Sequence, residues 1–316
     1  MANVHFPLTD YDVLHTLGRG SFGRVRLARK KVDQSFYAMK VLKKAMCVNS
    51  KQVDHVFSEF RILAQLKHPF IVGSYGLAQD SRYLYLLLEY IRGGELFRYL
   101  RSRPPLDNSH ARFYAGQVVL IFEYLHSLSV VYRDLKPENL LLAADGYLKL
   151  TDFGFAKLIQ GRTYTLCGTP EYLSPEVLLN KGHSKPADWW TFGVLVYELL
   201  VGIDPFSADS PMEVYQNILH KKPRFPPYVD SAAKSLIRHL LVADLSKRYG
   251  CLKNGVHDIK FHAWFSGFDW VQLVTKQMPA PYVPPELSDF RSEGKYPDSP
   301  ALSSALVPEA DPFLTW

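Results

Sequence analysis

The sequence contains little cysteine and no long apolar stretch. Its 316 residues include 3 cysteines, Cys47, Cys167 and Cys251, which lie far apart and form no C-x-x-C pair. A sparse, odd number of cysteines is typical of reduced thiols, so we expect a cytoplasmic or nuclear protein without a disulfide framework. No run of about 18 apolar residues occurs, and we therefore expect neither a membrane-spanning helix nor a membrane partner.

The sequence also lacks a recognisable leader and a strong charge of one sign. Residues 1–7 contain neither a basic region nor an apolar region, so no secretory leader is expected. Lys and Arg number 37 against 31 Asp and Glu, which gives a net charge of +6. An excess of this size is weak evidence for a nucleic-acid partner, and we predict none. With 47% hydrophobic and 22% charged residues, the composition is that of an ordinary globular chain.

The first 91 residues are rich in strand patterns. Helical spacing occurs once there, in residues 51–67, where Val56, Leu63 and Leu66 fall on one stripe. The remaining short apolar or alternating runs predict strands over residues 11–17, 25–28, 36–42 and 83–88.

Helical patterns follow from residue 93 onward, over residues 108–128, 188–201 and 231–241. The second of these is apolar almost all round, which indicates a helix buried at the centre of a lobe. Proline becomes dense from residue 269, which predicts an extended tail. We therefore predict an α+β fold with a small β-rich lobe (1–91), a large, mainly helical lobe (92–268) and a tail (269–316).

A G-x-G-x-x-G pattern is formed by Gly18, Gly20 and Gly23. A dinucleotide-binding turn has the same letters, but it requires a helix directly afterwards, and residues 24–28 are strand-like. Glycines also let a backbone approach phosphates closely, and Lys40 on a neighbouring strand offers them a positive partner. The pattern therefore favours nucleotide-phosphate binding over an oxidoreductase.

One acid occupies an otherwise apolar helix stripe. Glu59 lies in register with Val56, Leu63 and Leu66. A solvated helix charge is the common reading for a glutamate, but an acid on the inward face needs a partner, because burying an unpaired charge is costly. Lys40 is the candidate, and the pair would hold this lysine in place for phosphates.

Two polar loops follow apolar strands in the middle of the chain. The first carries Asp134, Lys136 and Asn139, and the second carries Asp152. Asn139 and Asp152 offer the hard oxygen ligands that Mg²⁺ prefers. Asp134 can orient a hydroxyl and accept its proton, while Lys136 can stabilise charge on a transferred group. A merely polar loop does not explain both segments together with Lys40 and the glycines.

These segments are similar to the signature motifs of the protein kinase family. The chain resembles protein kinases of the AGC group, and within it the cAMP-dependent kinases, over about residues 10–268. The motifs that carry the resemblance are GRGSFGRV at 18–25, AMK at 38–40, YRDLKPEN at 132–139, DFG at 152–154 and GTPEYLSPE at 168–176.

The resemblance implies a bilobal kinase fold, with residues 1–91 as the ATP-binding lobe, 92–268 as the catalytic and substrate-binding lobe, and 269–316 as an AGC-type tail. It implies ATP and Mg²⁺ as cofactors, Asp134, Lys136, Lys40 and Glu59 as catalytic residues, and Asn139 and Asp152 as Mg²⁺ ligands. The implied nucleotide-binding residues are Gly18, Gly20, Ser21, Phe22, Gly23, Val25, Ala38, Lys40, Glu89, Ile91, Glu95 and Leu141.

The resemblance also implies regulation by phosphorylation. Thr165 matches the activation-loop site, and its phosphate would be held by His55, Arg133 and Lys157. Ser304 has the spacing of a second site in the tail. The FLTW sequence at 313–316 is similar to the terminal aromatic motif that docks on the small lobe, and Arg248 with Glu176 matches a structural ion pair.

The implied substrates are proteins with Arg upstream of the phosphorylated Ser or Thr. Glu95, Glu138 and Glu198 match acids that read such arginines, and guanidinium suits carboxylates through bidentate bonds. Leu166, Pro170 and Leu173 match the pocket for an apolar residue just after the target.

A cAMP-binding regulatory subunit is the implied partner. The alternatives are another AGC kinase that cAMP does not regulate, and a pseudokinase scaffold without catalysis. The intact set Lys40, Glu59, Asp134, Asn139 and Asp152 argues against the scaffold.

Three residues depart from the family pattern. Ser174 replaces the usual Ala of the A-P-E motif, a small change. Ser74 stands where an apolar residue normally packs behind the helix of Glu59. Tyr164 replaces a tryptophan on the surface that meets the regulatory subunit in cAMP-dependent kinases, so partner binding follows from the resemblance less firmly than catalysis.

Overall fold

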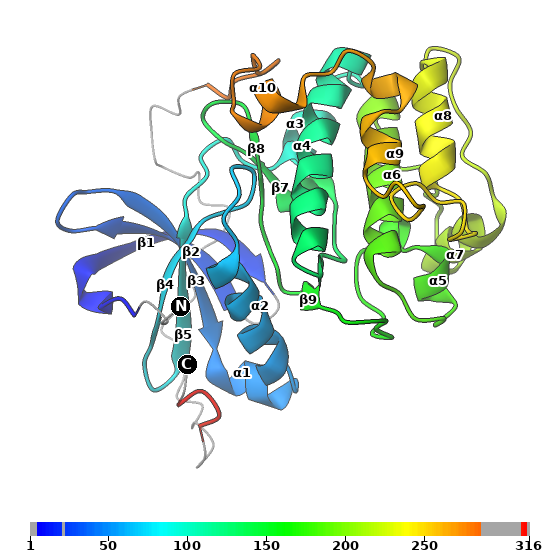
Figure 1. Ribbon diagram of the computed structural model, residues 1–316. Helices are drawn as coiled ribbons and strands as arrows, with labels where there is room; N and C mark the ends of the chain where they lie inside the picture. The colour runs from blue at the N-terminus through cyan, green and yellow to red at the C-terminus, as the bar shows by residue number, and fades with distance from the viewer. Residues whose placement is uncertain (1–4, 21–22, 286–310, 315–316) are drawn as a thin grey trace. The chain divides into compact units, whose positions relative to one another are not determined.

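The computed structural model describes residues 5–20, 23–285 and 311–314 (Figure 1). The chain divides into two compact units. The first, here called the sheet unit, comprises Met1–Lys67, Val72–Arg92 and Pro285–Trp316. The second, the helical unit, comprises His68–Ile71 and Gly93–Pro284. These two units are described one at a time.

The sheet unit is built on an antiparallel sheet of five strands in the order β1-β2-β3-β5-β4. In this sheet Lys40 on β3 lies opposite Val25 on β2 and Leu86 on β5, so the lysine occupies the central strand. The strands are β1 (Tyr11–Gly20), β2 (Gly23–Lys30), β3 (Phe36–Lys43), β4 (Ser74–Gln79) and β5 (Tyr83–Glu89).

Helix α2 (Val53–Gln65) buries one face, which includes Val56, Phe60 and Leu63, and so realises the predicted helical stripe. A short helix α1 (Lys44–Asn49) precedes it, and neither α1 nor β4 was predicted. The sequence of β4, SYGLAQ, is poor in β-branched residues, which hides a strand whose Leu77 and Ala78 are nevertheless buried.

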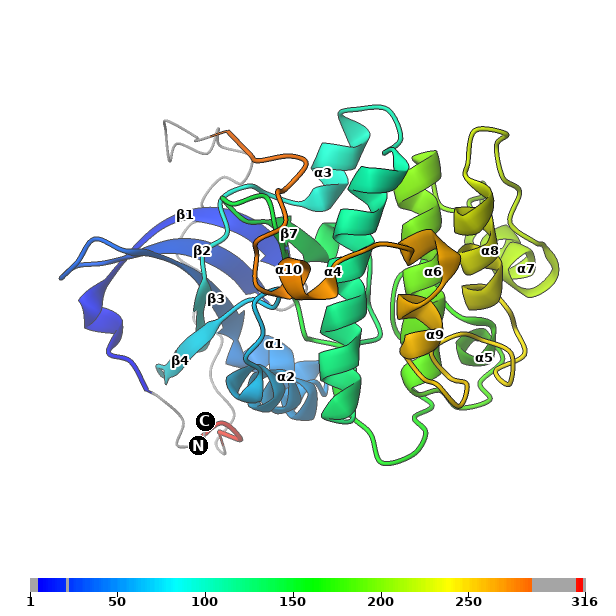
Figure 2. The same cartoon turned by 45° about the horizontal axis from the view of Figure 1, so that its top comes forward.

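The helical unit is organised around α4 (Asn108–Ser127) and α6 (Lys185–Val201), which pack against each other, with α8 (Ser231–Leu240) beside α6 (Figure 2). Helix α6 is buried on nearly all sides, as its apolar sequence predicts. Asp107 caps the start of α4 by accepting a hydrogen bond from the backbone N–H of His110 at 2.9 Å. The other helices are α3 (Leu96–Arg101), α5 (Pro175–Leu178), α7 (Pro211–His220), α9 (His257–Lys260) and α10 (Trp270–Val274).

Four short strands connect the loops that carry the polar motifs. They pair as β6 (Val130–Val131) with β9 (Lys157–Leu158) and as β7 (Leu140–Leu142) with β8 (Leu148–Leu150). In the second pair Leu140 lies opposite Leu150, and the backbone N–H of Thr151 donates to the carbonyl of Asn139 at 2.9 Å. This pairing brings Asn139 and Asp152 to the same end of one hairpin.

The expectation of an extended tail from residue 269 is wrong for its first part. Asp269 caps a helix, α10, by accepting hydrogen bonds from the backbone N–H groups of Val271 and Gln272. Leu273 of α10 is fully buried. The proline-rich part of the chain therefore begins only after this helix. The predicted phosphosite Ser304 lies outside the described residues.

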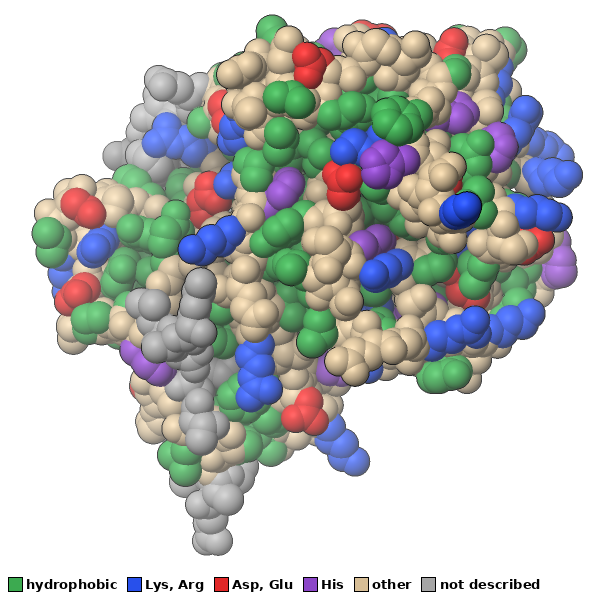
Figure 3. Space-filling model, in the orientation of Figure 1, with side chains coloured by type: hydrophobic (Ala, Val, Ile, Leu, Met, Phe, Trp, Pro, Cys, Tyr) green, Lys and Arg blue, Asp and Glu red, His purple; other side chains and the backbone are tan. Residues whose placement is uncertain are grey.

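The small excess of positive charge is unevenly distributed. On the face shown in Figure 3, basic side chains gather at the end of the helical unit near α7 and α8. Exposed Lys221, Lys222, Arg224 and Arg238 belong to this region. Within the described part of the chain, no helix is both long enough and apolar enough to cross a membrane.

Candidate active site

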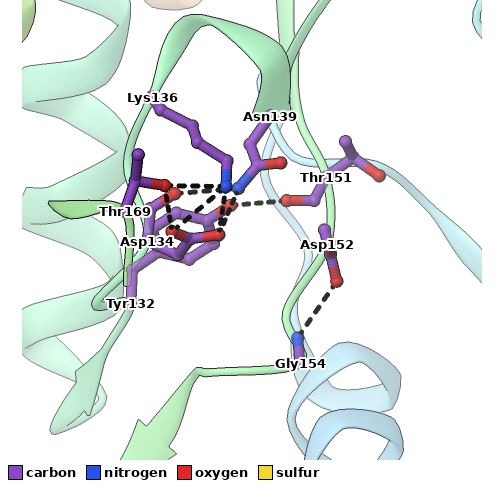
Figure 4. Close-up of polar contacts among 8 residues, drawn as sticks. All are labelled: Tyr132, Asp134, Lys136, Asn139, Thr151, Asp152, Gly154 and Thr169. Atoms are coloured by element: carbon purple, nitrogen blue, oxygen red, sulfur yellow. Dashed lines mark hydrogen bonds and ion pairs between the residues drawn. The ribbon is translucent and has the colours of Figure 1, made fainter. Parts of the chain in front are cut away.

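Asp134 lies at the centre of a group of polar side chains in the helical unit (Figure 4). Asn139 donates from Nδ2 to Asp134 Oδ2 at 2.9 Å, and Lys136 Nζ lies 3.1 Å from the same oxygen. Thr169 Oγ1 is 3.3 Å from Asp134 Oδ1 and accepts a hydrogen bond from Lys136 at 2.9 Å. Burial raises the pKa of Asp134 above its ordinary value, and Lys136 opposes this rise. The carboxylate is thus fixed in direction and remains close to a cation.

Asp188 holds the backbone of the loop that carries Asp134. Its Oδ1 accepts a hydrogen bond from the N–H of Arg133 at 2.8 Å, and its Oδ2 accepts one from the N–H of Tyr132 at 3.0 Å. His126 Nε2 lies 2.8 Å from the same Oδ2. These bonds fix Arg133 with a φ of 73°, a left-handed conformation that a non-glycine residue rarely adopts. The loop therefore keeps Asp134 in one orientation.

Sequence reasoning assigned no role to Asp188. The signal was present, because this acid begins the nearly all-apolar run 188–201 and is fully buried. A buried charge of this kind needs partners, as was argued for Glu59. Thr169 was also missed, because nothing in its sequence position indicates that it reaches Lys136.

The predicted Mg²⁺ ligands lie close together along the β7–β8 hairpin. Asn139 uses its amide nitrogen to bond Asp134, and Figure 4 shows its amide oxygen pointing toward the strand that carries Thr151 and Asp152. Asp152 is exposed and has a left-handed φ of 54°. A buried amide oxygen on Asn139 and an exposed carboxylate on Asp152 are two hard oxygen donors that fit Mg²⁺, which keeps several waters and binds substrate phosphates. Among the described residues, no group of three or more His, Cys, Asp and Glu forms a self-sufficient metal site.

In the sheet unit, Lys40 and Glu59 form the expected ion pair. Lys40 Nζ lies 2.5 Å from Glu59 Oε1, joining β3 to α2. The side chains are 19% and 8% exposed, so water screens the pair only weakly. The pair orients the lysine from a strand in the middle of the sheet.

The glycines of the G-x-G-x-x-G pattern lie at the end of β1 and the start of β2, and they differ in whether packing requires a glycine. A Cβ on Gly23 would lie 1.8 Å from the carbonyl oxygen of Val41, so only glycine fits there. Among the described residues, no atom lies within 4 Å of a Cβ added to Gly18 or Gly20, so packing there does not demand glycine at these two positions. Ser21 and Phe22, between Gly20 and Gly23, lie outside the described residues.

The other predicted nucleotide-binding residues are divided between the two units. Val25, Ala38, Glu89 and Ile91 belong to the sheet unit, and the side chain of Glu89 accepts a hydrogen bond from the N–H of Gly73 at 3.0 Å. Glu95 and Leu141 belong to the helical unit, where they form an isolated antiparallel bridge.

The predicted phosphosite Thr165 is exposed. Two residues earlier, Thr163 exchanges both backbone hydrogen bonds with His183, at 2.9 and 2.8 Å, and its Oγ1 accepts from Lys157 at 3.1 Å. Arg133 is buried and donates from Nε to the carbonyl of Phe155 at 2.6 Å. Its Nη1 has no hydrogen-bond partner within the described part of the chain, and burial lowers the pKa of the guanidinium.

Lys157 thus contacts the segment that carries Thr165, through Thr163, and Arg133 lines a small cavity with Gly168 and Thr169, which follow that segment. His55 belongs to the sheet unit, where it is exposed on α2 and its Nδ1 lies 2.5 Å from Gln52 Oε1. Its predicted contact with a phosphate on Thr165 stays a prediction.

The three acids predicted to read arginine have different surroundings. Glu198 is buried and accepts hydrogen bonds from the Tyr172 hydroxyl and from Arg101 Nη2, the latter at 3.1 Å. Burial raises the pKa of Glu198. Glu138 is half-buried in the short turn Pro137–Asn139, and Glu95 is half-buried at the start of α3. The partners Tyr172 and Arg101 were not predicted from the sequence.

The three residues predicted to form an apolar pocket differ in their exposure. Leu173 is buried, Pro170 begins a short turn (Pro170–Tyr172), and Leu166 has 64% of its surface exposed. Of the departures from the family pattern, Ser174 is buried and Tyr164 is 62% exposed beside Gly182. Ser74 is half-buried and begins β4 opposite Leu88.

Comparison with known proteins agrees with this geometry. The protein kinase domain family matches residues 11–265. The human cAMP-dependent protein kinase catalytic subunit PRKX is 44% identical over 308 residues, covering 97% of this chain and 86% of that protein. Type 3 cAMP-dependent protein kinase of Saccharomyces cerevisiae is 48% identical over 280 residues, 89% of this chain and 70% of that protein.

A third relative is longer than this chain. The cAMP-dependent protein kinase catalytic subunit of Arthrobotrys oligospora is 47% identical over 297 residues, and the match spans 93% of this chain but 57% of that protein. The resemblance to kinases and the expected α+β fold are both confirmed. The chain therefore belongs to the protein kinase family, as a serine/threonine kinase similar to the catalytic subunits of cAMP-dependent protein kinases.

Proposed function

We propose that this chain transfers the γ-phosphoryl group of ATP to Ser or Thr hydroxyls of proteins that carry Arg upstream of the target. The observation that carries this proposal is the position of Asp134, which Asn139 and Lys136 hold by contacts of 2.9 and 3.1 Å. A fixed, ionised carboxylate can orient a substrate hydroxyl and accept its proton. Lys136, on the same side, can stabilise charge on the transferred group.

Protein kinases in general use ATP and Mg²⁺. Here residues 1–91 would bind ATP through the glycine turn and Lys40, which Glu59 holds in place. Asn139 and Asp152 would bind Mg²⁺, which neutralises phosphate charge when bound. Residues 92–268 would bind the substrate and perform the proton transfer.

Arginine recognition is assigned to the acids Glu95, Glu138 and Glu198. A carboxylate binds guanidinium through charge-assisted, often bidentate hydrogen bonds. Leu166, Pro170 and Leu173 would accept an apolar residue after the target. The chain's net charge of +6 does not attract a basic substrate, so the local acids have to provide this attraction.

Peptide phosphorylation with Mg²⁺ and γ-labelled ATP tests the activity. Wild type should label a Ser peptide with upstream arginines, and Lys40→Met should label it at close to background while its circular dichroism spectrum shows that the fold is retained. Equal labelling by Lys40→Met would contradict the mechanism. Nucleotide or partner binding without any labelling by the wild type would instead favour the pseudokinase scaffold.

Regulation by a cAMP-binding subunit is proposed from the names of the relatives. A pull-down with such a subunit should capture the chain and release it when cAMP is added. No capture, or capture that ignores cAMP, would favour another AGC kinase, regulated mainly through Thr165. Tyr164→Trp is the informative variant, because Tyr164 is exposed on the surface where the family pattern has tryptophan.

A further inference from the structure

The short helix α3 and the residues just after it carry arginines that differ in how firmly they are held. Arg101 donates to the carbonyl of Gly202 at 2.5 Å and to Glu198 at 3.1 Å, and its guanidinium lies 4.8 Å from the centre of the Phe97 ring. Arg103 donates to the hydroxyl of Tyr99 at 2.7 Å and lies 3.8 Å from the centre of that ring. Both guanidinium groups are therefore fixed by several contacts.

Arg98 on the same helix is held far more loosely. Its side chain is 56% exposed, and within the described residues its recorded polar contact is an ion pair with Glu95, at 3.7 Å between Nε and Oε2. This distance is too long for a direct hydrogen bond. Arg98 thus places an exposed positive charge beside an acid that is itself 36% exposed.

We propose that Arg98 determines substrate specificity by weakening the selection for arginine at the one upstream position that Glu95 reads. The inference rests on the proposed function of Glu95 as an arginine-reading acid. A substrate guanidinium has to displace Arg98 from Glu95 or share the carboxylate with it, and it meets a like charge in either case. An acidic residue at that substrate position instead meets the exposed guanidinium of Arg98.

The same reasoning does not apply to Glu198. Its carboxylate is 5% exposed and already bonded to Tyr172 and Arg101, so Arg101 is part of the structure that holds this acid. Removing Arg101 would leave a buried acid without its cation, whereas removing Arg98 leaves a solvated one. The effect of Arg98 is therefore confined to the position read by Glu95.

The size of the effect of Arg98 follows from the exposure of its ion pair with Glu95. Exposed ion pairs contribute little because water and salt screen them, and removal of the competing partner should strengthen arginine selection by about 1.5- to 5-fold. The measured quantity is the ratio of kcat/KM for two peptides that differ only by Arg or Ala at one upstream position, at saturating ATP. Each upstream position is varied in turn.

Four proteins are compared: wild type, Arg98→Ala, Glu95→Gln and the double variant. Arg98→Ala should raise the Arg-to-Ala ratio at one position and lower kcat/KM for a peptide with Glu there. In the Glu95→Gln background the same change should leave the ratio unaltered, as a double-mutant cycle requires. Lys253→Ala, which removes an exposed positive charge elsewhere in the helical unit, is the matched control and should leave every ratio unchanged.

Two outcomes would overturn the inference. One is an unchanged ratio in Arg98→Ala; the other is a similar rise at every upstream position, because that reports a long-range change in charge. Failure of the proposed arginine preference can be recognised separately. A wild type that ignores arginine everywhere contradicts that preference, and if Arg98→Ala then gains it at one position, the role of Arg98 is supported.

Discussion

Arg248 and Glu176 form a buried, two-pronged ion pair in the helical unit. Nη1 of the arginine lies 2.7 Å from Oε1 of the glutamate, and Nη2 lies 3.0 Å from Oε2. The arginine is fully buried and also donates to the carbonyls of Val242 and Pro186. The two residues are 72 positions apart, so the pair ties α5 to the region that follows α8.

Glu176→Gln should destabilise the helical unit strongly. Removing one partner of a buried ion pair typically lowers the free energy of unfolding by about 3–5 kcal/mol, because the remaining charge stays buried. Denaturant unfolding measures the change. Lys247→Ala, which breaks the exposed pair with Asp244, should have little effect, and equal effects of both variants would contradict the structural role of Glu176.

Asp134→Asn should abolish most of the activity without such a loss of stability. Losing a general base reduces kcat by about 10²–10⁴-fold. Burial raises the pKa of Asp134, so its protonated form adds stability at low pH that is lost as the pH rises through the folded-state pKa. At neutral pH the ionised group therefore adds no such stability, and the neutral amide should be tolerated.

The same raised pKa has a kinetic consequence. A base works only when ionised, so the acid limb of the pH–kcat profile should lie above the ordinary carboxyl value of 3.8. Lys136→Ala removes the cation that opposes the rise and should move this limb to higher pH. A limb that stays in place in Lys136→Ala would contradict the coupling between the two residues.

Gly23→Ala should disturb the sheet unit. The added methyl group would lie 1.8 Å from the carbonyl oxygen of Val41, so β2 and β3 must separate. We expect a lower melting temperature together with a higher KM for ATP. Gly20→Ala is the matched control, because no atom of the described residues lies within 4 Å of its added methyl, and its melting temperature should stay close to that of the wild type.

Phe313→Ala should release the end of the tail from the sheet unit. Phe313 is fully buried, its ring lies 5.6 Å from that of Phe57, and its carbonyl accepts a hydrogen bond from Gln79. Truncating a buried phenylalanine typically lowers the free energy of unfolding by about 3–5 kcal/mol. Here the loss is limited to the free energy with which the end of the tail docks on the rest of the sheet unit. Hydrogen exchange of α1 and α2 should increase, whereas Leu314→Ala, at a residue 79% exposed, should leave it unchanged.

Local patterns in the sequence predicted the fold where one face of an element is apolar. Helices α2, α4, α6 and α8 and four of the five strands of the sheet have such faces. Helix α3 was not predicted, because it is only six residues long and three of these, Arg98, Tyr99 and Arg101, have charged or polar side chains. Helix α10 was concealed by the prolines that follow it.

The site divides in the same way. Motif spacing identified Asp134, Asn139 and Lys40, because polar residues in apolar surroundings mark chemistry. It could not identify Asp188 or Thr169, whose roles depend on contacts with residues more than 30 positions away. Nor could it show that Arg101 bonds Glu198, because these residues are 97 positions apart and meet only through the packing of the helical unit. The pair of Arg98 with Glu95 is different, since its spacing of three positions is a local signal that the sequence contains.

The double hydrogen bond between Thr163 and His183 has a consequence for the timing of activation. It anchors the chain just before Thr165, and the bond from Lys136 to Thr169 anchors it just after. Only residues 164–168 form the arc between these anchors. Ordering a residue costs about 1–2 kcal/mol, and the two anchors limit this cost to the five residues between them. A phosphate on Thr165 would therefore order only this short segment, which is a fast local change and does not require slow refolding.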